Sequence, residues 1–263
     1  MIDSLSAVHP KAHLGKFVSV GPFSVIENDV VIGDGTWIGS NVNIMSGARI
    51  GKNCRIFPGA VISAIPQDLK YEGEETQAII GDNTTIRECV TINKGTKARG
   101  STEIGSNCLL MAYTHVAHDC VVGNHCILAN ASTLAGHINI GDYAILGGLT
   151  AVHQFVNIGR HAMLSGCSLV GKDVPPYTKA ARRPLSYAGV NSIGLRRRGY
   201  DNKTISHIQD IYRILYLGKN NTAQALEIIE AEIPVTDERD EIISFINASQ
   251  RGIMKKYSRN GRE

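Results

Sequence analysis

The chain is poor in aromatic residues and in charge of either sign, and it has no long apolar run. Aromatic residues make up 6% of its 263 residues, charged residues make up 19%, and the formal net charge is +3. So mild a charge argues against a dedicated nucleic-acid-binding protein. No apolar stretch reaches the length of about 18 residues that a transmembrane helix needs. The N-terminus lacks the basic head and apolar stretch of a secretory signal, so we expect a cytoplasmic protein.

Cysteine pairs are absent as well. The six cysteines never form a C-x-x-C pair, and a disulfide framework needs a secreted context that this sequence does not indicate. We therefore expect all six to be reduced, buried thiols. The sequence calls for no metal and no cofactor.

What the chain does have is glycine, at 27 residues, and an aliphatic repeat with a period of six. Every sixth position from 8 to 62, from 80 to 92 and from 104 to 170 is Ile, Leu or Val. Glycine often follows this residue, and a small residue usually stands two places before it. Four cysteines fall in the column of small residues, which favours a packing role over a metal or redox role: Cys54, Cys108, Cys120 and Cys126.

A period of six fits neither an α-helix, which buries residues at about 3.6, nor an isolated strand, which buries them at 2. A short strand plus a turn does explain it, if each hexad forms one wall of a coil. Three walls then give a coil of three hexads, and neighbouring coils would stack roughly 4.8 Å apart. Each aliphatic residue points into a shared core, and its burial stabilises the fold by about 1.5–3 kcal/mol.

Two segments break the repeat, near residues 63–79 and 94–103. The first is polar, and the second is charged and rich in glycine, so both are predicted to be loops that leave the solenoid. Insertions of this kind often serve binding. The repeat stops near Pro175-Pro176. We therefore predict a β-helix over residues 1–177 and a linker with a small helical domain over residues 178–263.

Helical periodicity predicts three helices in this second domain. The first begins at Asp201 or Asn202, and the second begins at Asn221 or Thr222, because these residues are good N-caps. Each expected helix has one apolar face, formed by Ile205, Ile208, Ile211 and Leu215 in the first, by Leu226, Ile229 and Ile233 in the second, and by Ile242, Ile243, Ile246 and Ile253 in the third.

Four histidines gather in the repeat region, at positions 115, 118, 137 and 153. Asp119 and His137 are three hexads apart, as are His118 and Gly136, so each pair should stack one coil apart. A histidine beside a carboxylate and a free backbone N–H suits acyl transfer to a hydroxyl: the ring takes the proton and the N–H stabilises the oxyanion. From the residues alone two alternatives stay open, turn histidines without a function and a zinc site.

The hexad pattern resembles the hexapeptide-repeat family, whose fold is the left-handed parallel β-helix. Several segments are more specifically similar to its acyl-carrier-protein–UDP-N-acetylglucosamine O-acyltransferases. This resemblance covers essentially the whole chain. The segments that carry it are His115–Cys120, Leu134–His137, Ala151–Phe155, Gln67–Tyr71, Asp173–Tyr177, and Asn191 together with Arg197–Gly199.

The resemblance implies a mainly β protein, a left-handed parallel β-helix with a small C-terminal α-helical domain. It implies a homotrimer with active sites between subunits. Such enzymes transfer a β-hydroxyacyl group from acyl carrier protein to the 3-hydroxyl of UDP-N-acetylglucosamine, the first step of lipid A biosynthesis. His118 would then be the general base, Asp119 would support it, and Gly136 would supply the oxyanion N–H. The residues implied in substrate binding are Gln67, Asp68, Lys70, His115, His137, His153, Gln154, Asn191, Arg197 and Arg198.

Gly166 occupies the position that acts as an acyl-chain ruler in that family, and a glycine there implies a long β-hydroxyacyl donor. The chain departs from the family pattern at Pro184, where a histidine is frequent, and at Ile193, where an acidic residue is frequent. Other functions remain open: a CoA-dependent acyltransferase or a metal-dependent carbonic anhydrase of the same fold, or a scaffold without catalysis.

Overall fold

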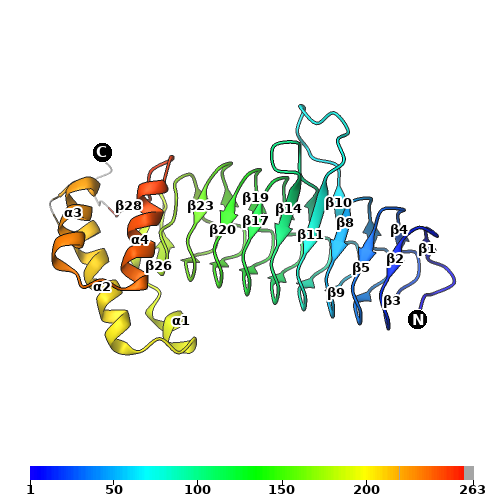
Figure 1. Ribbon diagram of the computed structural model, residues 1–263, viewed down its shortest axis with the longest axis horizontal. Helices are drawn as coiled ribbons and strands as arrows, with labels where there is room; N and C mark the ends of the chain where they lie inside the picture. The colour runs from blue at the N-terminus through cyan, green and yellow to red at the C-terminus, as the bar shows by residue number, and fades with distance from the viewer. Residues whose placement is uncertain (219, 258–263) are drawn as a thin grey trace.

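A computed structural model describes residues 1–218 and 220–257, so residue 219 and residues 258–263 of the expected second domain lie outside the described residues. The chain forms a long three-sided coil with the N-terminus at one end and a cluster of helices at the other (Figure 1). One polar excursion projects from the side of the coil, between β10 and β11. No helix among the described residues is long and apolar enough to cross a membrane.

Three sheets form the walls of the coil, and consecutive strands along the chain belong to successive walls. The first wall has nine strands: β1 (Ala7–Val8), β4 (Val25–Ile26), β7 (Asn43–Ile44), β10 (Val61–Ala64), β13 (Thr91–Asn93), β16 (His115–Val116), β19 (Thr133–Leu134), β22 (Ala151–Val152) and β25 (Leu169–Val170). The second wall has eight: β2 (His13–Leu14), β5 (Val31–Ile32), β8 (Ala48–Ile50), β11 (Gln77–Ile80), β14 (Ser101–Ile104), β17 (Val121–Val122), β20 (Asn139–Ile140) and β23 (Asn157–Ile158).

The third wall has eleven strands and reaches into the C-terminal region. They are β3 (Ser19–Val20), β6 (Trp37–Ile38), β9 (Arg55–Ile56), β12 (Thr85–Ile86), β15 (Leu109–Leu110), β18 (Ile127–Leu128), β21 (Ile145–Leu146), β24 (Met163–Leu164), β26 (Thr178–Ala181), β27 (Ser186–Val190) and β28 (Lys255–Lys256). All pairings are parallel except that of β26 with β27. We call the turns from the first wall to the second the first edge, those from the second to the third the second edge, and those from the third to the first the third edge.

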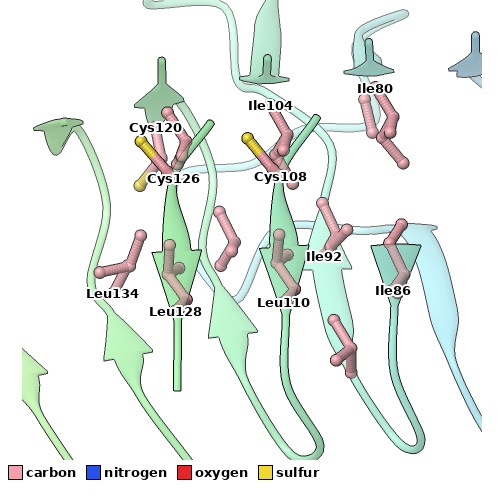
Figure 2. Close-up of a cluster of buried hydrophobic side chains, with 14 of the residues drawn as sticks. Ile80, Ile86, Ile92, Ile104, Cys108, Leu110, Cys120, Cys126, Leu128 and Leu134 are labelled. Atoms are coloured by element: carbon pink, nitrogen blue, oxygen red, sulfur yellow. The ribbon is translucent and has the colours of Figure 1, made fainter. Parts of the chain in front are cut away.

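The aliphatic column of the repeat lines the inside of the coil, as predicted. Val116 pairs with Leu134 one coil later, and both side chains are fully buried. Figure 2 shows isoleucine, leucine and cysteine side chains from successive coils pointing into one continuous core. Because each coil offers only one aliphatic side chain per wall, the core is stable only when neighbouring coils stack on it.

Four of the cysteines are buried as expected, but the prediction was wrong for Cys89 and Cys167. Both lie in turns of the third edge with φ angles of 56° and 58°. Cys89 is half-buried and Cys167 is exposed. The glycine column has a separate cause: a Cβ on Gly105 would lie 2.7 Å from the carbonyl carbon of Gly123 in the next coil, so the coils stack too closely there for any side chain.

The two breaks in the repeat lengthen two coils. Arg49 pairs with Ile79, Ile79 pairs with Glu103, and Glu103 pairs with Val121, so the spacing along the chain falls from five hexads to four and then to three. The strands β10, β11 and β14 include residues that were predicted to belong to the ends of the loops. The first loop therefore covers residues 65–76 and the second covers residues 94–100.

Four helices follow the coil: α1 (Ser192–Arg197), α2 (Asn202–Leu217), α3 (Thr222–Glu232) and α4 (Asp237–Ala248). The predicted starts of α2 and α3 are confirmed, with Asp201 and Asn221 as N-caps. Ile253 does not belong to the third predicted helix, because α4 ends at Ala248 and residue 253 instead forms a bridge with Asp173. Periodicity missed α1, which is too short to display a helical repeat.

Candidate active site

Two consecutive turns of the first edge bring the candidate catalytic residues together. His118 and Asp119 follow β16, and Gly136 and His137 follow β19 in the next coil. The His137 N–H donates to the His118 carbonyl oxygen at 3.0 Å, so the predicted stacking one coil apart is confirmed. Turns at this edge place the side chains on the outside of the coil while the flanking strands hold their backbone.

Asp119 and His118 form a buried pair. His118 Nδ1 lies 2.8 Å from Asp119 Oδ2, and the two residues are 7% and 2% exposed. A carboxylate can only accept, so Nδ1 carries the proton and Nε2 is left as the basic nitrogen. Burial by itself would raise the pKa of the Asp119 carboxyl, but hydrogen bonds from His118 and Thr96 outweigh it and hold that pKa below its usual range. Asp119 is therefore an anion at neutral pH.

Gly136 lies directly against the His118 ring. A Cβ built on this glycine would lie 2.6 Å from Cε1 and 2.8 Å from Nε2 of His118. Its backbone N–H has no acceptor among the described residues. A base nitrogen and a free N–H so close together can serve both the proton and the developing oxyanion of an acyl transfer.

His118 and Gly136, both largely buried, line an open cleft of about 660 Å³. The first loop forms one side of it, and the outer face of the first wall forms the floor. Burial lowers the pKa of His115 on that floor, and its Nδ1 lies 2.7 Å from the Thr91 hydroxyl. The cleft brings together many of the predicted residues, namely Gln67, Asp68, Lys70, His115, His118, Gly136 and Gln154.

His137 lies against the His118–Asp119 pair, and His153 lies outside the lining of the cleft. The His137 ring packs edge-on against His118 at 5.0 Å between ring centroids and stacks on Phe155 at 4.8 Å. Its Nε2 lies 3.7 Å from Asp119 Oδ2. Burial lowers the pKa of His137, and the Asp119 carboxylate opposes this shift only in part. His153 is exposed and does not line the cleft.

The three predicted residues of the helical region lie at the second edge, away from the cleft. Asn191 caps α1, and its side-chain N–H donates to the His161 carbonyl oxygen at 3.0 Å. The Arg198 guanidinium lies over the Tyr143 ring, and Arg197 is exposed. The structure of one chain therefore does not bring these residues to the His118–Asp119 pair.

Gly166 lies in a turn of the third edge. A Cβ there would meet the Gly148 carbonyl oxygen of the preceding coil at 3.1 Å. The outer face of the first wall separates this turn from the first edge. A chain lying on that face could extend from the cleft toward Gly166.

Sequence reasoning missed residues that touch the candidate site. Thr96 binds the Asp119 carboxylate, Thr91 binds His115, and Phe155 stacks on His137. The signal for Phe155 was present, because it stands three hexads after His137. Thr96 could not be found by the three-hexad spacing, since its coil is lengthened by the second loop.

Among the described residues, His118, Asp119 and His137 could in principle hold a metal, with one donor atom each within 4.8 Å of the others. These same atoms are, however, engaged with one another. Asp119 Oδ2 already accepts from His118 and from the Thr96 hydroxyl. That arrangement suits acid–base chemistry.

Comparison with known proteins identifies the repeats and the C-terminal region separately. Residues 29–64 and 101–136 match the family described as bacterial transferase hexapeptide (six repeats). Residues 173–254 match the family described as UDP N-acetylglucosamine O-acyltransferase, domain 2. The repeat match indicates that the coil is a left-handed parallel β-helix, followed by a helical region, as the sequence predicted.

Relatives and solved structures match over nearly the whole chain. Acyl-[acyl-carrier-protein]–UDP-N-acetylglucosamine O-acyltransferases of Chlorobium phaeobacteroides and of a Sulfurihydrogenibium species are 56% and 53% identical, covering 95% and 98% of this chain and 96% of each relative. The structure of a UDP-N-acetylglucosamine acyltransferase from Bacteroides fragilis is 50% identical with a TM-score of 0.96, covering 97% of this chain and 100% of its own. A structure from Acinetobacter baumannii is 40% identical with a TM-score of 0.93, covering 97% and 99%.

Proposed function

Because the chain belongs to the acyl-[acyl-carrier-protein]–UDP-N-acetylglucosamine O-acyltransferases and is therefore an O-acyltransferase, we propose that it transfers a β-hydroxyacyl group to the sugar 3-hydroxyl. The donor is acyl carrier protein and the acceptor is UDP-N-acetylglucosamine. The reaction takes place in the cytoplasm and is the first step of lipid A biosynthesis.

General-base catalysis by His118 is the mechanism that the geometry supports. Nε2 of His118 takes the proton of the 3-hydroxyl as the sugar oxygen attacks the thioester carbon. The Gly136 N–H stabilises the oxyanion of the tetrahedral intermediate. The C–S bond then breaks, and the protonated His118 returns its proton to the sulfur of the carrier protein. Asp119 keeps the ring in the required tautomer and stabilises its positive charge.

One observation carries this proposal. His118, which is paired with Asp119, and Gly136, whose N–H is free, line the same open cleft. Each part has a known task in acyl transfer to a hydroxyl, and no serine or cysteine nucleophile is needed. A scaffold protein would have no use for a buried carboxylate anion paired with an imidazole that lines a cleft.

We assign the acceptor to the cleft and its first loop. Gln67, Asp68 and Lys70 offer donors, an acceptor and a cation to the nucleotide-sugar, and Gln154 lines the same cleft. His115, His137 and His153 are assigned to the sugar and the acyl chain. Arg197 and Arg198 suit phosphates and an acidic carrier protein, because guanidinium groups donate in pairs and remain charged.

A site shared between subunits reconciles this assignment with the single chain. Asn191 and Arg198 contact the second edge, whereas the cleft opens at the first edge. A second copy packed beside the first would bring its second edge to this cleft. Three such copies around an axis would complete three equivalent sites, and this arrangement is our proposal for the oligomer.

Gly166 is assigned as the ruler that sets acyl length. It lies across the first wall from the cleft and leaves the surface there open. We therefore propose a long β-hydroxyacyl donor.

A mass-spectrometric assay tests the reaction. The wild type and a His118→Ala variant are incubated with UDP-N-acetylglucosamine and a panel of β-hydroxyacyl carrier proteins. We expect an acylated nucleotide-sugar from the wild type and a loss of about 10²–10⁴-fold in the folded variant, the usual contribution of a general base.

Other outcomes redirect the assignment. Product made equally well by His118→Ala would remove His118 from the mechanism. Wild type that is inactive with the 3-hydroxyl sugar but active with its 3-amino analogue would change the acceptor. Turnover of acetyl-CoA, or zinc-dependent hydration of CO₂, would favour the other hexapeptide enzymes.

A further inference from the structure

Thr96, in the second loop, binds the candidate catalytic carboxylate and does not itself line the cleft. It is 6% exposed. Its backbone N–H donates to Oδ1 of Asp119 at 3.0 Å, and its hydroxyl donates to Oδ2 at 2.7 Å. One residue therefore binds both oxygens of the carboxylate. Oδ2, the oxygen that receives the Thr96 hydroxyl, is also the oxygen that receives His118 Nδ1.

We propose that Thr96 is a positioning residue of the acyl transfer, which fixes the Asp119 carboxylate and thereby the orientation and basicity of His118. This inference rests on the proposed function and adds to it a residue that does not touch the substrate.

The need for such a residue follows from the backbone of Asp119. Asp119 lies in the left-handed region, with φ of 60°, in a turn where its side chain projects outward from the coil. Its backbone N–H donates to the Thr102 hydroxyl at 2.9 Å, which holds the main chain but leaves the carboxylate free to rotate. Donors to both oxygens remove that freedom. Oδ2 then stays in line with His118 Nδ1 during the reaction.

The Thr96 hydroxyl also shares the charge of Oδ2. A hydrogen bond to an ionised acceptor draws charge from it, so Oδ2 is a weaker partner for a protonated His118 than an unshared carboxylate oxygen would be. Without the hydroxyl, the charge on Oδ2 would favour the protonated ring more strongly. The acid limb of the pH–rate profile would then move to higher pH.

Hydrogen bonds also connect the second loop, which holds this carboxylate, to the end of the first loop. The Thr76 hydroxyl donates to the Gly95 carbonyl oxygen at 2.6 Å, and the Gly95 N–H donates to the Gln77 carbonyl oxygen at 3.0 Å. The Lys97 N–H donates to Oε1 of Glu74 at 3.0 Å. Thr96 stands between these two anchors. The loop assigned to the acceptor and the Asp119–His118 pair are thus braced by one short segment.

The test compares Thr96→Val, Thr96→Ser and a matched control in the same protein. Valine keeps the shape and the backbone N–H but removes the hydroxyl, and serine keeps the hydroxyl. Thr36→Val is the control, because the Thr36 hydroxyl is also buried and bonded, to Gly51 and Cys54, but lies coils away from the cleft. Thermal unfolding of all variants reports whether each one is folded.

For Thr96→Val we expect kcat to fall roughly tenfold or more, as for loss of a hydrogen bond to a charged group. We expect KM for UDP-N-acetylglucosamine to change little, and the acid limb of the pH–rate profile to move to higher pH. Thr96→Ser should restore both kcat and the acid limb. Thr36→Val should lose stability without moving the acid limb.

A second readout does not depend on turnover. Carbethoxylation of His118 by diethyl pyrocarbonate, followed by peptide mass spectrometry across pH, should show its midpoint at higher pH in Thr96→Val than in wild type. A folded Thr96→Val enzyme with the wild-type pH–rate profile and the wild-type carbethoxylation midpoint would overturn the inference. Wild type that makes no acylated sugar would instead refute the proposed function, and the carbethoxylation midpoints would still decide the role of Thr96.

Discussion

The first and second edges of the coil both carry a histidine at the same place in the repeat, yet the two histidines lie in opposite environments. His137 at the first edge has φ of 61°, and His161 at the second edge has φ of 56°. Each stands in a column whose members recur once per coil. The backbone supplies the same slot at both edges, so any difference between them comes from what surrounds the slot.

At the first edge the neighbours are a carboxylate and an open cleft. Asp119 precedes His137 in the column, and His118 beside it lines the cleft. At the second edge the neighbours are aromatic rings and the C-terminal region. His161 stacks on Tyr143 at 4.8 Å and on Tyr177 at 5.7 Å, and it is only 2% exposed.

The environment also decides the charge of the second histidine. Burial, aided by the nearby Arg160 and Arg198 guanidinium groups, lowers the pKa of His161 to about 4. Its Nδ1 has no hydrogen-bond partner among the described residues. His161 is therefore a neutral packing residue where the coil meets α1. The same turn position thus holds a half-buried histidine next to Asp119 at the first edge and a buried, neutral histidine between aromatic rings at the second.

The first-edge arrangement can be broken at Gly136. In Gly136→Ala the new Cβ would lie 2.6 Å from the His118 ring, so the ring must move away from the position proposed for the general base. We expect kcat/KM to fall about 100-fold or more, since a displacement of about 1 Å costs this much. The mass-spectrometric assay measures it.

Gly171→Ala is the matched control for this variant. A Cβ at Gly171 meets nothing within 4 Å, so activity should stay near that of the wild type. An active Gly136→Ala enzyme would show that contact between Gly136 and His118 is not required.

The second-edge arrangement is tested by the pH dependence of stability. His161 has a lower pKa folded than unfolded, so between about pH 6.5 and pH 4 the unfolded chain binds a proton that the folded chain does not. Stability from this group is complete above about pH 6.5 and is lost as the pH falls toward 4, by about 3 kcal/mol. His161→Phe should keep the aromatic stack and remove this loss. Denaturant unfolding at several pH values measures it.

His125→Phe provides the control at the same edge. His125 stacks on Tyr143 at 4.6 Å but is exposed, so its replacement should leave the acid loss in place. An equal change in both variants would mean that burial does not set the behaviour of His161.

The third edge extends the comparison, because its turns contain no histidine and its proposed role is to limit the length of the acyl chain. Gly166→Met would fill the surface that Gly166 leaves open. We expect kcat/KM for a longer donor to fall about tenfold relative to one two carbons shorter, since each methylene contributes about 0.8 kcal/mol of burial. A panel of acyl carrier proteins of different chain length measures this ratio. An unchanged preference would refute the assignment of Gly166 as the ruler.

Much of the architecture could be predicted from local sequence. The hexad determines which residues face the core, because the same position of every hexad points inward. Each regular strand pairs with the strand three hexads later, and this spacing also brings Asp119 to His137 and His118 to Gly136. Helix starts were predictable because Asp201 and Asn221 cap their own helices. The exposure of Cys89 and Cys167 could not be predicted, because cysteine side chains are usually buried but these two lie in turns that expose them.

The coil, its core and the stacking of His118 and Asp119 on Gly136 and His137 follow from the amino-acid sequence alone, since they depend on contacts at a constant spacing along the chain. Contacts without such a spacing were settled only by the packing of the folded chain. Thr96 reaches Asp119 only because the second loop folds back over the next coil. His161 is buried only because α1 and its neighbours cover the second edge. Such contacts depend on how separate segments pack in space, and no local pattern in the chain encodes that.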